Sequence, residues 1–459
     1  MLNSKFVRLL AALLALSLIA AACGDSDDAS DSADDTAAAT TEAPTTTEAA
    51  DDDMSEEDDM ADDDMAEDDM AEDDMSEDMM FEAPAISIGY LLPQTGGLSV
   101  IVDALVKPLE MLAAEANEHG GDVTLVPGDS GTDPNVASAS VDQLLNDDVS
   151  AIMGAAASGV STSVLDKITG SQVVQCSGSN TAASLSVVDD GGFYFRTAPS
   201  DVLQGPALAD LIADDGGTTV GVVFRNDEYG AGFAEVLTEG LEANGLAVAA
   251  SVAYDPEATS FDAEAGELAA AGLDAVVVVA FAEGAQLFQA MIEAGVGPAD
   301  VATYVTDGVK DSVSWDAIDP DNPAVMEGIR GTAPSAAPAN GEATFGDRFA
   351  EFAPDAPNIF SAQFYDCMMV TLLASAVAGS ADPADFVSEM IGVTSGGTKC
   401  TSYHDCIGLI GAGEDIDYDG ASGPLEFGDN GEPTVGTYDL YEYDAEGAAI
   451  TFDQLVLEQ

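Results

Sequence analysis

From Ala85 onward, short runs rich in aliphatic and β-branched residues alternate with segments of helical periodicity. The first block of this alternation contains four predicted buried strands, at 86–92, 122–129, 150–156 and 172–178. Amphipathic helices are predicted between them, at 102–120 and at 134–147, the second with Pro134 in its first turn. Strands and helices that alternate at this spacing form parallel sheets covered by helices, with right-handed crossovers.

A second block repeats the pattern further along the chain. Its predicted strands are 218–227, 246–254, 274–281 and 302–308, and its predicted helices are 231–245, 261–272 and 285–295. The connections RTAPSD (196–201) and IRGTAPS (329–335) lie where one block passes into the other. The sequence therefore predicts two α/β lobes joined by several crossings, and the cleft between such lobes is the expected ligand site.

The N-terminus has the pattern of an export signal. Lys5 and Arg8 precede the apolar run 9–19, which is too short to span a bilayer permanently. Cys23 follows three alanines and precedes a glycine, which resembles the lipobox of bacterial lipoproteins although the usual Leu is missing. We predict a signal peptide over 1–22 and lipidation of Cys23, and Ala-x-Ala cleavage that releases a soluble form is the alternative.

Residues 23–84 form a low-complexity acidic segment without Lys or Arg, and 51–80 repeat an acidic pentad that ends in Met. Such a composition buries too little apolar surface to offset its backbone entropy, so a disordered linker is predicted. A metal-binding role is disfavoured, because a five-residue spacing turns Met about 140° around a helix and forms no single stripe. The whole chain carries 86 acidic and 10 basic residues, which excludes nucleic acid and anionic membranes as partners and suggests a salty habitat.

Three segments carry a specific resemblance: IGYLLPQTGGLS (88–99), RTAPSDVLQGPALADLI (196–212) and VVFRNDEYGAGFAEVLTEGL (222–241). Over roughly residues 86–455 the chain resembles type I periplasmic binding proteins, and more closely the branched-chain amino acid receptors of ABC importers. The resemblance implies an α/β fold of two Rossmann-like lobes, with parallel sheets flanked by helices and a ligand cleft between them. On this basis lobe 1 comprises 85–199 and 333–424, and lobe 2 comprises 200–332 and 425–459.

The family binds the α-carboxylate of an amino acid through hydroxyls and backbone N–H groups of two loops in the first lobe. The matching position in the first loop is Ser158, just before a predicted helix whose N-terminus favours an anion. In the second loop, Gly178, Ser179 and Asn180 fall where the family uses backbone groups and a Thr hydroxyl. The alternative interpretation is that these residues only cap helices and form turns.

The ligand's ammonium group needs an acidic partner, and the resemblance assigns that role to Asp307 in YVTDGVKDS. An Asp-Gly turn without any ligand role explains the same residues. Tyr229 and Phe281 match aromatic positions that face the family's cleft, or else they pack at strand ends. Ile101 replaces an aromatic wall, which predicts a wider side-chain pocket.

The implied function is that of an extracytoplasmic receptor of an ABC importer. It closes its lobes on an amino acid, branched-chain or similarly apolar, and delivers it to a membrane permease. The resemblance implies a monomer at the outer face of the membrane, without cofactor or metal, for which the acidic segment is a spacer. A receptor for amides, urea-like compounds or aromatic acids on the same fold is the alternative. A surface hydrolase is a distant one, because only His119 and His404 exist and no nucleophile–base motif is present.

Two further motifs have competing interpretations. Asp415, Asp417, Asp419, Gly420 and Glu426 match the D-x-D-x-D-G-x5-E calcium loop, yet Pro424 and the β-like residues after it favour a structural turn.

Four cysteines follow Cys23, in a compartment that permits disulfides. Cys400 and Cys406 are close enough for a small-loop disulfide, and with His404 they could instead supply zinc ligands. A Cys176–Cys367 bridge is conceivable, but sequence alone allows three pairings.

Overall fold

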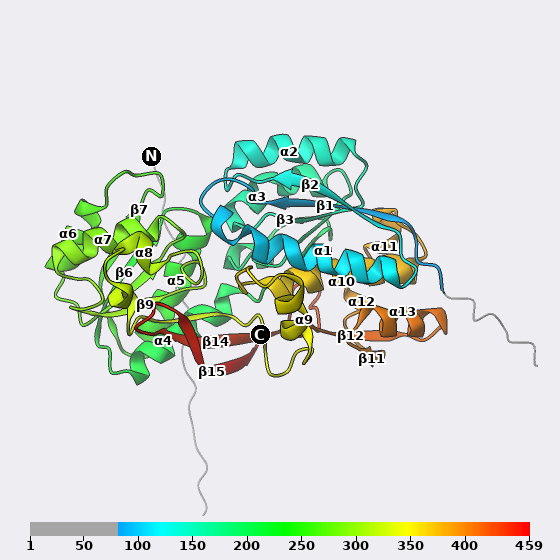
Figure 1. The fold of residues 1–459 in the computed structure, drawn as a ribbon. Helices are drawn as coiled ribbons and strands as arrows, with labels where there is room; N and C mark the ends of the chain where they lie inside the picture. The colour runs from blue at the N-terminus through cyan, green and yellow to red at the C-terminus, as the bar shows by residue number, and fades with distance from the viewer. Residues whose placement is uncertain (1–80) are drawn as a thin grey trace, which may run out of the picture. The chain divides into compact units, whose positions relative to one another are not determined.

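The alternating pattern forms two sheets, each covered by helices, in the computed structural model shown in Figure 1. The structure describes residues 81–459. The predicted signal peptide, Cys23 and nearly all of the predicted acidic linker therefore lie outside the described residues.

The first sheet contains the four strands predicted in the first block and one short strand more. Its order is β2-β1-β3-β4-β5, and all neighbouring strands are parallel. The strands are β1 (Ile86–Leu92), β2 (Val123–Asp129), β3 (Ala151–Gly154), β4 (Val174–Ser177) and β5 (Tyr194–Arg196). Residues of β3, β4 and β5 are buried throughout, as expected for a parallel sheet with both faces covered.

The second sheet is mixed. Its order is β15-β14-β10-β9-β8-β6-β7, and β14 and β15 run antiparallel at one edge of an otherwise parallel sheet. The strands are β6 (Thr219–Arg225), β7 (Ala247–Tyr254), β8 (Ala275–Val279), β9 (Ala302–Val305), β10 (Arg330–Pro334), β14 (Val435–Tyr443) and β15 (Ala449–Glu458). Three of these strands were not predicted: β10, which lies in the predicted connection 329–335, and the pair β14 and β15, which no helix separates.

Helices cover both sheets. Those around the first sheet are α1 (Val102–Glu118), α2 (Pro134–Asn146), α3 (Ser158–Thr169) and α10 (Ser361–Ala378). Those around the second are α4 (Asp201–Asp214), α5 (Glu228–Ala243), α6 (Asp262–Ala270), α7 (Gly284–Ala294) and the short α8 (Trp315–Ile318). Sequence signals fix their starts: the Asp133 side chain caps α2 by accepting hydrogen bonds from the N–H groups of Asn135 and Val136, and Pro134 occupies the first helical position.

Helix α10 is apolar on every side. Its length and composition would allow it to cross a membrane, but most of it is buried inside the protein, where it packs against α1 and the strands β3 and β4. A helix with apolar residues all around is the expected form of such a core element. The disulfide Cys176–Cys367 joins it to β4, and the Cα atoms of the two cysteines are 5.9 Å apart.

The chain passes between the two sheets three times: after β5, after β10 and before β14. The division into lobe segments stays a prediction, and its boundary between 332 and 333 falls inside β10 of the second sheet. A small third sheet, β11 (Thr398–Cys400), β12 (Ile416–Gly420) and β13 (Gly423–Pro424), precedes the last crossing. The remaining helices are α9 (Phe345–Phe352), α11 (Pro383–Phe386), α12 (Glu389–Gly392), α13 (Tyr403–Gly411), and the 3-10 turns η1 (Ser99–Ile101), η2 (Ala183–Val187) and η3 (Pro323–Met326).

Cys400 and Cys406 also form a disulfide, which links β11 to α13. With both sulfurs so engaged, the zinc alternative loses two of its three ligands. The structure thus gives one of the three pairings that the sequence allowed.

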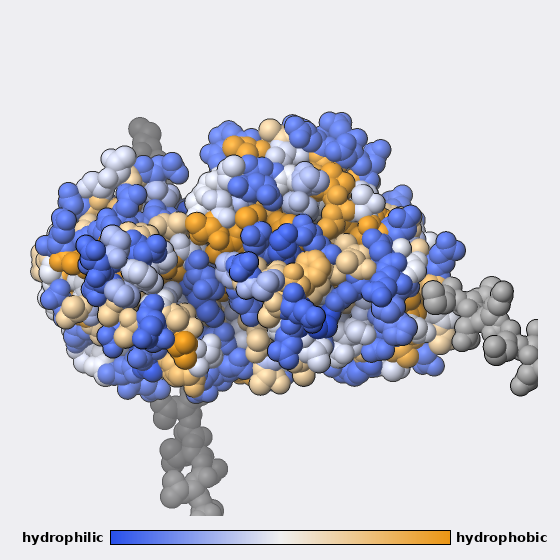
Figure 2. Space-filling model, viewed as in Figure 1, coloured by the Kyte–Doolittle hydropathy of each residue, from blue (hydrophilic) through white to orange (hydrophobic). Residues whose placement is uncertain are grey.

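The surface is strongly hydrophilic, and the basic residues on it are few. On the face shown in Figure 2, hydrophilic residues spread across both lobes and are interrupted by small apolar patches. Each of the eight Lys and Arg residues within 81–459 forms an ion pair with an Asp or Glu. No basic side chain of this part of the chain is therefore left free to bind an anionic ligand.

Candidate functional site

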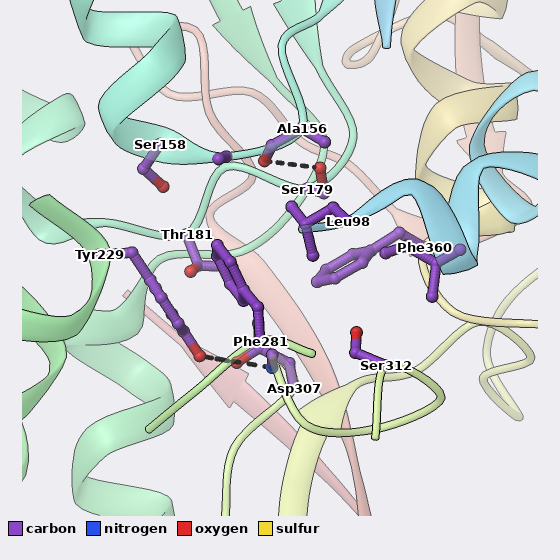
Figure 3. A pocket seen from close by; sticks show the side chains of 13 residues that line it. Leu98, Ala156, Ser158, Ser179, Thr181, Tyr229, Phe281, Asp307, Ser312 and Phe360 are labelled. Atoms are coloured by element: carbon purple, nitrogen blue, oxygen red, sulfur yellow. Dashed lines mark hydrogen bonds between the residues drawn. The ribbon is translucent and has the colours of Figure 1, made fainter. Parts of the chain in front are cut away.

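A cavity lies between the two lobes, where the carboxyl ends of the parallel strands meet (Figure 3). It encloses about 360 Å³ of space free of atoms, part of it open to solvent. Lobe 1 contributes residues that follow β1, β3 and β4, and lobe 2 contributes residues that follow β6, β8 and β9. Ligand sites in open α/β sheets form at this edge, because loops at the carboxyl ends of the strands converge there.

The first wall of the cavity is the N-terminus of α3. Ser158 is the first residue of this helix, lines the cavity and is 2% exposed. The preceding Ala157 offers no side chain to cap the helix, so the first backbone N–H groups remain available. Ser158 Oγ accepts a long hydrogen bond from the backbone N–H of Ala182, 3.4 Å away. The hydroxyl and the helix N-terminus together make this wall favourable for an anion.

The loop after β4 forms the next part of the wall, and here the structure differs from the sequence interpretation. Ser179 and Thr181 line the cavity, whereas Gly178 and Asn180 do not. Ser179 Oγ donates to the carbonyl of Ala156 at 3.0 Å, which ties the two loops together (Figure 3). Thr181, one position after the predicted Asn180, is the residue of this loop whose hydroxyl faces the site.

Asn180 has a structural role instead. Its side chain is fully buried, and its Nδ2 donates to the carbonyls of Ala155 and Ala156 at 3.0 and 2.9 Å. Its Oδ1 accepts a hydrogen bond from the hydroxyl of Tyr194 at 3.1 Å. Because all these groups belong to lobe 1, Asn180 holds the two loops in place and is not available to a ligand.

Gly178 is required by close packing. A Cβ at this position would lie 2.6 Å from the backbone nitrogen of Phe364 and 2.8 Å from the carbonyl carbon of Gln363, both in α10. Any larger residue would push the loop away from the helix. The glycine therefore sets the position of Ser179 and Thr181 without contacting the cavity.

The wall on lobe 2 is an aromatic stack. The rings of Tyr229 and Phe281 are nearly parallel, with centroids 5.4 Å apart, and both line the cavity (Figure 3). The guanidinium carbon of Arg225 lies 3.5 Å from the centroid of the Phe281 ring on the other side. Arg225 is itself held by Asp227 and Glu283, at 2.6 and 2.7 Å. The stack is thus fixed by a cation–π contact and two ion pairs, and it presents a rigid face to the ligand.

Asp307 supplies the acidic group of the cavity. It follows β9, is 4% exposed, and accepts hydrogen bonds at Oδ1 from Gln204 Nε2 at 2.9 Å and from the Tyr229 hydroxyl at 3.1 Å. Within the described residues its other oxygen, Oδ2, receives no hydrogen bond. Burial raises the pKa of Asp307 to about 6, although both hydrogen bonds act in the opposite direction. A buried carboxylate with an open oxygen is suited to bind a positively charged ligand group, and the nearby Lys310 is paired with Asp439.

Four more residues line the cavity. The sequence analysis expected Ile101 in the wall of the side-chain pocket, and it did not assign Leu98, Ser312 or Phe360 to the site. Leu98, Ile101 and Phe360 form its apolar end, and Ser312 lies at its margin (Figure 3). Phe360 precedes α10 and adopts a left-handed backbone conformation, with φ of 60°. The predicted widening at Ile101 is therefore offset by an aromatic ring from another segment. No local pattern marks Phe360, because it reaches the site from more than 250 residues beyond Leu98.

The calcium-loop motif contains an ammonium group in this structure. Lys399 Nζ lies 3.0 Å from Asp417, 2.9 Å from Asp419 and 3.6 Å from Glu426. The turn inside the motif, 420–422, is held by Asp366 of α10. No group of three or more metal-ligating side chains is found among residues 81–459. These contacts support the interpretation of the motif as a structural turn.

Known proteins share this architecture. Residues 85–448 match the family model described as periplasmic binding protein. The chain is 25% identical over 367 residues to the chemotactic signal transduction system substrate-binding protein BasB of Halobacterium salinarum. The aligned residues cover 76% of this chain and 85% of that protein.

Two solved structures share the fold. A leucine-binding protein of Thermotoga maritima superposes with a TM-score of 0.67 at 20% identity, over 81% of this chain and 98% of that one. A solute-binding protein of an R. palustris ABC transporter, in complex with benzoate, superposes with a TM-score of 0.66 at 15% identity, over 82% and 98%. These likenesses confirm the predicted two-lobed α/β fold. Since the family match spans most of the sequence, the chain belongs to the periplasmic binding protein family, and it is a binding protein rather than an enzyme.

Proposed function

We propose that the protein is the receptor of an ABC importer and captures a small amino acid with an apolar side chain. One observation carries this proposal: a helix N-terminus and a carboxylate with one oxygen free of hydrogen bonds line the same cavity, one from each lobe. A zwitterion carries a carboxylate and an ammonium group on neighbouring atoms. It is the class of small molecule that matches two such opposite features at once.

The carboxylate end of the ligand is assigned to lobe 1. The N-terminus of α3, the hydroxyl of Ser158 and the hydroxyl of Thr181 offer donors there. No Lys or Arg lines the cavity, and those within the described residues are all paired with carboxylates elsewhere. Backbone N–H groups at a helix N-terminus bind a carboxylate without a basic side chain.

The ammonium end is assigned to Asp307, whose Oδ2 is open. The apolar side chain of the ligand then fits between the aromatic stack of Tyr229 and Phe281 and the opposite wall of Leu98, Ile101 and Phe360. The cavity is small, which favours a ligand no larger than an amino acid.

Capture requires both lobes, because neither lobe alone contributes both the anion-binding wall and the carboxylate. The ligand binds to α3 in an open form, and rotation about the three crossings brings Asp307 and the aromatic stack onto it. Closure excludes water and strengthens the charge contacts. In this proposal a membrane permease recognises the closed form, and a lipid on Cys23, outside the described residues, anchors the receptor at the outer face of the membrane.

Aromatic acids are the second candidate ligands. The benzoate complex of the R. palustris protein and the aromatic wall in this cavity favour them. An aromatic acid has no ammonium group, so it would leave Asp307 without a cationic partner. Binding of an aromatic acid would therefore be insensitive to the charge of Asp307.

Calorimetry and thermal unfolding with amino acids, amides and aromatic acids test the proposal. We expect an apolar amino acid to bind and to raise the unfolding temperature. The matched variants Ser158→Ala and Asp307→Asn should both weaken amino acid binding, since they remove one partner of each ligand charge. If only aromatic acids or amides stabilise the protein, the amino acid assignment is wrong.

A further inference from the structure

Behind the cavity lies a second buried aspartate to which the proposed ligand-binding scheme assigns no role. Asp201 is the first residue of α4 and is fully buried. Its backbone N–H donates to the carbonyl of Thr181 at 2.8 Å, which places it directly behind a residue that lines the cavity. One helical turn further, Gln204 donates to Asp307 Oδ1 at 2.9 Å. Residues three apart on a helix share a face, so Asp201 lies between Thr181 and Asp307.

The carboxyl group of Asp201 receives no hydrogen bond of ordinary geometry, and the Thr181 hydroxyl is the donor near it that favours the charged form. Neither Oδ1 nor Oδ2 has a hydrogen-bond partner among residues 81–459, and neither oxygen is exposed. Buried polar groups in folded proteins are nearly always hydrogen-bonded, and an ionised carboxylate without donors or a counter-ion is among the costliest groups to bury. The position at a helix N-terminus favours an anion by only about 0.3–1 kcal/mol, far less than the cost of that burial.

The neighbouring charges do not change this balance. Arg196 is the nearest guanidinium, but its Nε donates to the buried Glu432 at 2.7 Å, and its other nitrogens donate to Ser186 and to the carbonyls of Asn180 and Ala182. Lys310, which acts on Asp307, pairs with Asp439 at 3.1 Å.

The two phenols near this pair, Tyr229 and Tyr438, are neutral at ordinary pH because burial raises the pKa of each. The remaining charged neighbour is Asp307 itself. Burial first, and then the charge of Asp307, raise the pKa of Asp201 well above its usual value.

Buried acceptors without partners surround the same position. Gln204 Oε1 has no partner among the described residues, and the two hydrogen bonds of Asp307 both reach Oδ1, which leaves Oδ2 without one. The Thr181 hydroxyl, which is also buried without a partner in this part of the chain, is one donor near these acceptors. The cluster therefore contains more acceptors than donors. A proton on Asp201 supplies one of the missing donors, and the ammonium group of the ligand supplies the others.

We infer that Asp201 is a neutral carboxylic acid at neutral pH that positions Asp307 and Thr181, so that the cation subsite is an acid–carboxylate pair with a single negative charge. This pair matches one ammonium group. Two ionised carboxylates would instead leave a negative charge uncompensated after a monoamino acid had bound. This consequence for ligand choice depends on the proposed function, whereas the charge state of Asp201 does not.

Infrared spectroscopy of the ligand-free protein tests the charge state at neutral pH. We expect a carbonyl band of a buried protonated carboxyl group that is present in the wild type, absent in Asp201→Asn and retained in the control Asp214→Asn, whose carboxylate is exposed on the same helix. If Asp201→Asn removes no such band, Asp201 is ionised and the inference is wrong. This measurement needs no ligand, so it stands even if the amino acid assignment fails.

Calorimetry with the amino acid that binds best tests the positioning role. Asp201→Ala removes the donor and should weaken binding about tenfold, whereas Asp201→Asn keeps an N–H donor without charge and should recover most of that loss. Equal losses in the two variants would show that the charge of Asp201 matters and would overturn the inference. If Asp201→Ala does not fold, the affinity of Asp201→Asn is compared with that of the wild type at about pH 6 and at about pH 8. An affinity more than about tenfold below that of the wild type contradicts a neutral acid at position 201.

Discussion

Two buried aspartates in this protein have similar burial and very different surroundings. Asp366 in α10 accepts four hydrogen bonds: from Tyr418 Oη and the Ala421 N–H at Oδ1, and from the N–H and hydroxyl of Ser422 at Oδ2. Asp307 accepts two, both at Oδ1. Burial raises the pKa of each to about 6. The difference shows that burial alone does not mark a binding site; an acceptor left without donors does.

The saturated aspartate has a structural role. Its partners lie in β12 and in the turn that follows it, before the last crossing between the lobes, so Asp366 ties this part of the chain to the core helix α10. Asp307 lies at the cavity. If protein donors filled all of its hydrogen-bonding positions, none would remain for a ligand.

The largest expected effect is the loss of stability in Asp366→Ala. The substitution leaves two buried and two partly buried donors without an acceptor, so we expect the free energy of unfolding to fall by about 3 kcal/mol or more. Chemical denaturation measures it. The control Asp347→Asn, at an exposed position in α9, should be near neutral. Equal stability of Asp366→Ala and wild type would contradict the structural role.

Asp307→Asn should have the opposite signature. Loss of the charge that holds the ligand's ammonium group should weaken binding by about 2 to 5 kcal/mol, which is at least about 30-fold, as measured by calorimetry. The unfolding temperature of the ligand-free protein should stay the same or rise, because a partly unsatisfied buried charge is removed. A variant that loses stability and keeps its affinity would place Asp307 in the same class as Asp366.

The pH dependence of stability separates the ionised from the neutral form of Asp307. Because its folded pKa is raised from 3.8 to about 6, the folded protein holds this proton more tightly than the unfolded chain does. Its contribution to stability is complete below about pH 4 and is lost as pH rises through about 6.

Asn at position 307 cannot ionise, so the stability gained by Asp307→Asn over wild type should be small at about pH 5 and larger at about pH 7.5. Thermal unfolding of both proteins at the two pH values measures this. A gain that does not change with pH would mean that Asp307 does not titrate in this window.

The sequence predicted the strands that alternate with helices, because burial on both faces leaves continuous apolar runs such as 275–279. It did not predict β14 and β15, whose pairing is antiparallel and needs no intervening helix. In the site, Ser158, Ser179, Tyr229, Phe281 and Asp307 line one cavity as the resemblance implied, and their contact with a ligand stays a prediction.

The side chain that lines the cavity at this point belongs to Thr181 and not to the predicted Asn180, and the sequence could not distinguish the two. Which side chain of a loop faces the cleft depends on backbone turns that the residue types at 178–181 do not determine. Thr181 carries the hydroxyl that the family pattern requires, one position later. Phe360 and Asp201 were missed for a different reason: their neighbours in the site belong to segments distant in sequence.

A third group of carboxylates resembles neither Asp366 nor Asp307, and the smallest effect on stability is expected there. Asp417, Asp419 and Glu426 are compensated neither by many hydrogen bonds nor by an external ligand, but by the ammonium group of Lys399. The Lys399 side chain is 52% exposed, so these ion pairs should contribute little.

Lys399→Met should therefore lower the free energy of unfolding by about 1 kcal/mol or less, because exposed ion pairs are screened by solvent. The same substitution removes the cation that lies among the motif's carboxylates. Thermal unfolding with and without Ca²⁺ then distinguishes two explanations. If only Lys399→Met is stabilised by Ca²⁺, the motif has ligand geometry that the lysine normally occupies. If neither protein responds, its resemblance to a calcium loop reflects the abundance of Asp in this chain, and the turn depends on Asp366 alone.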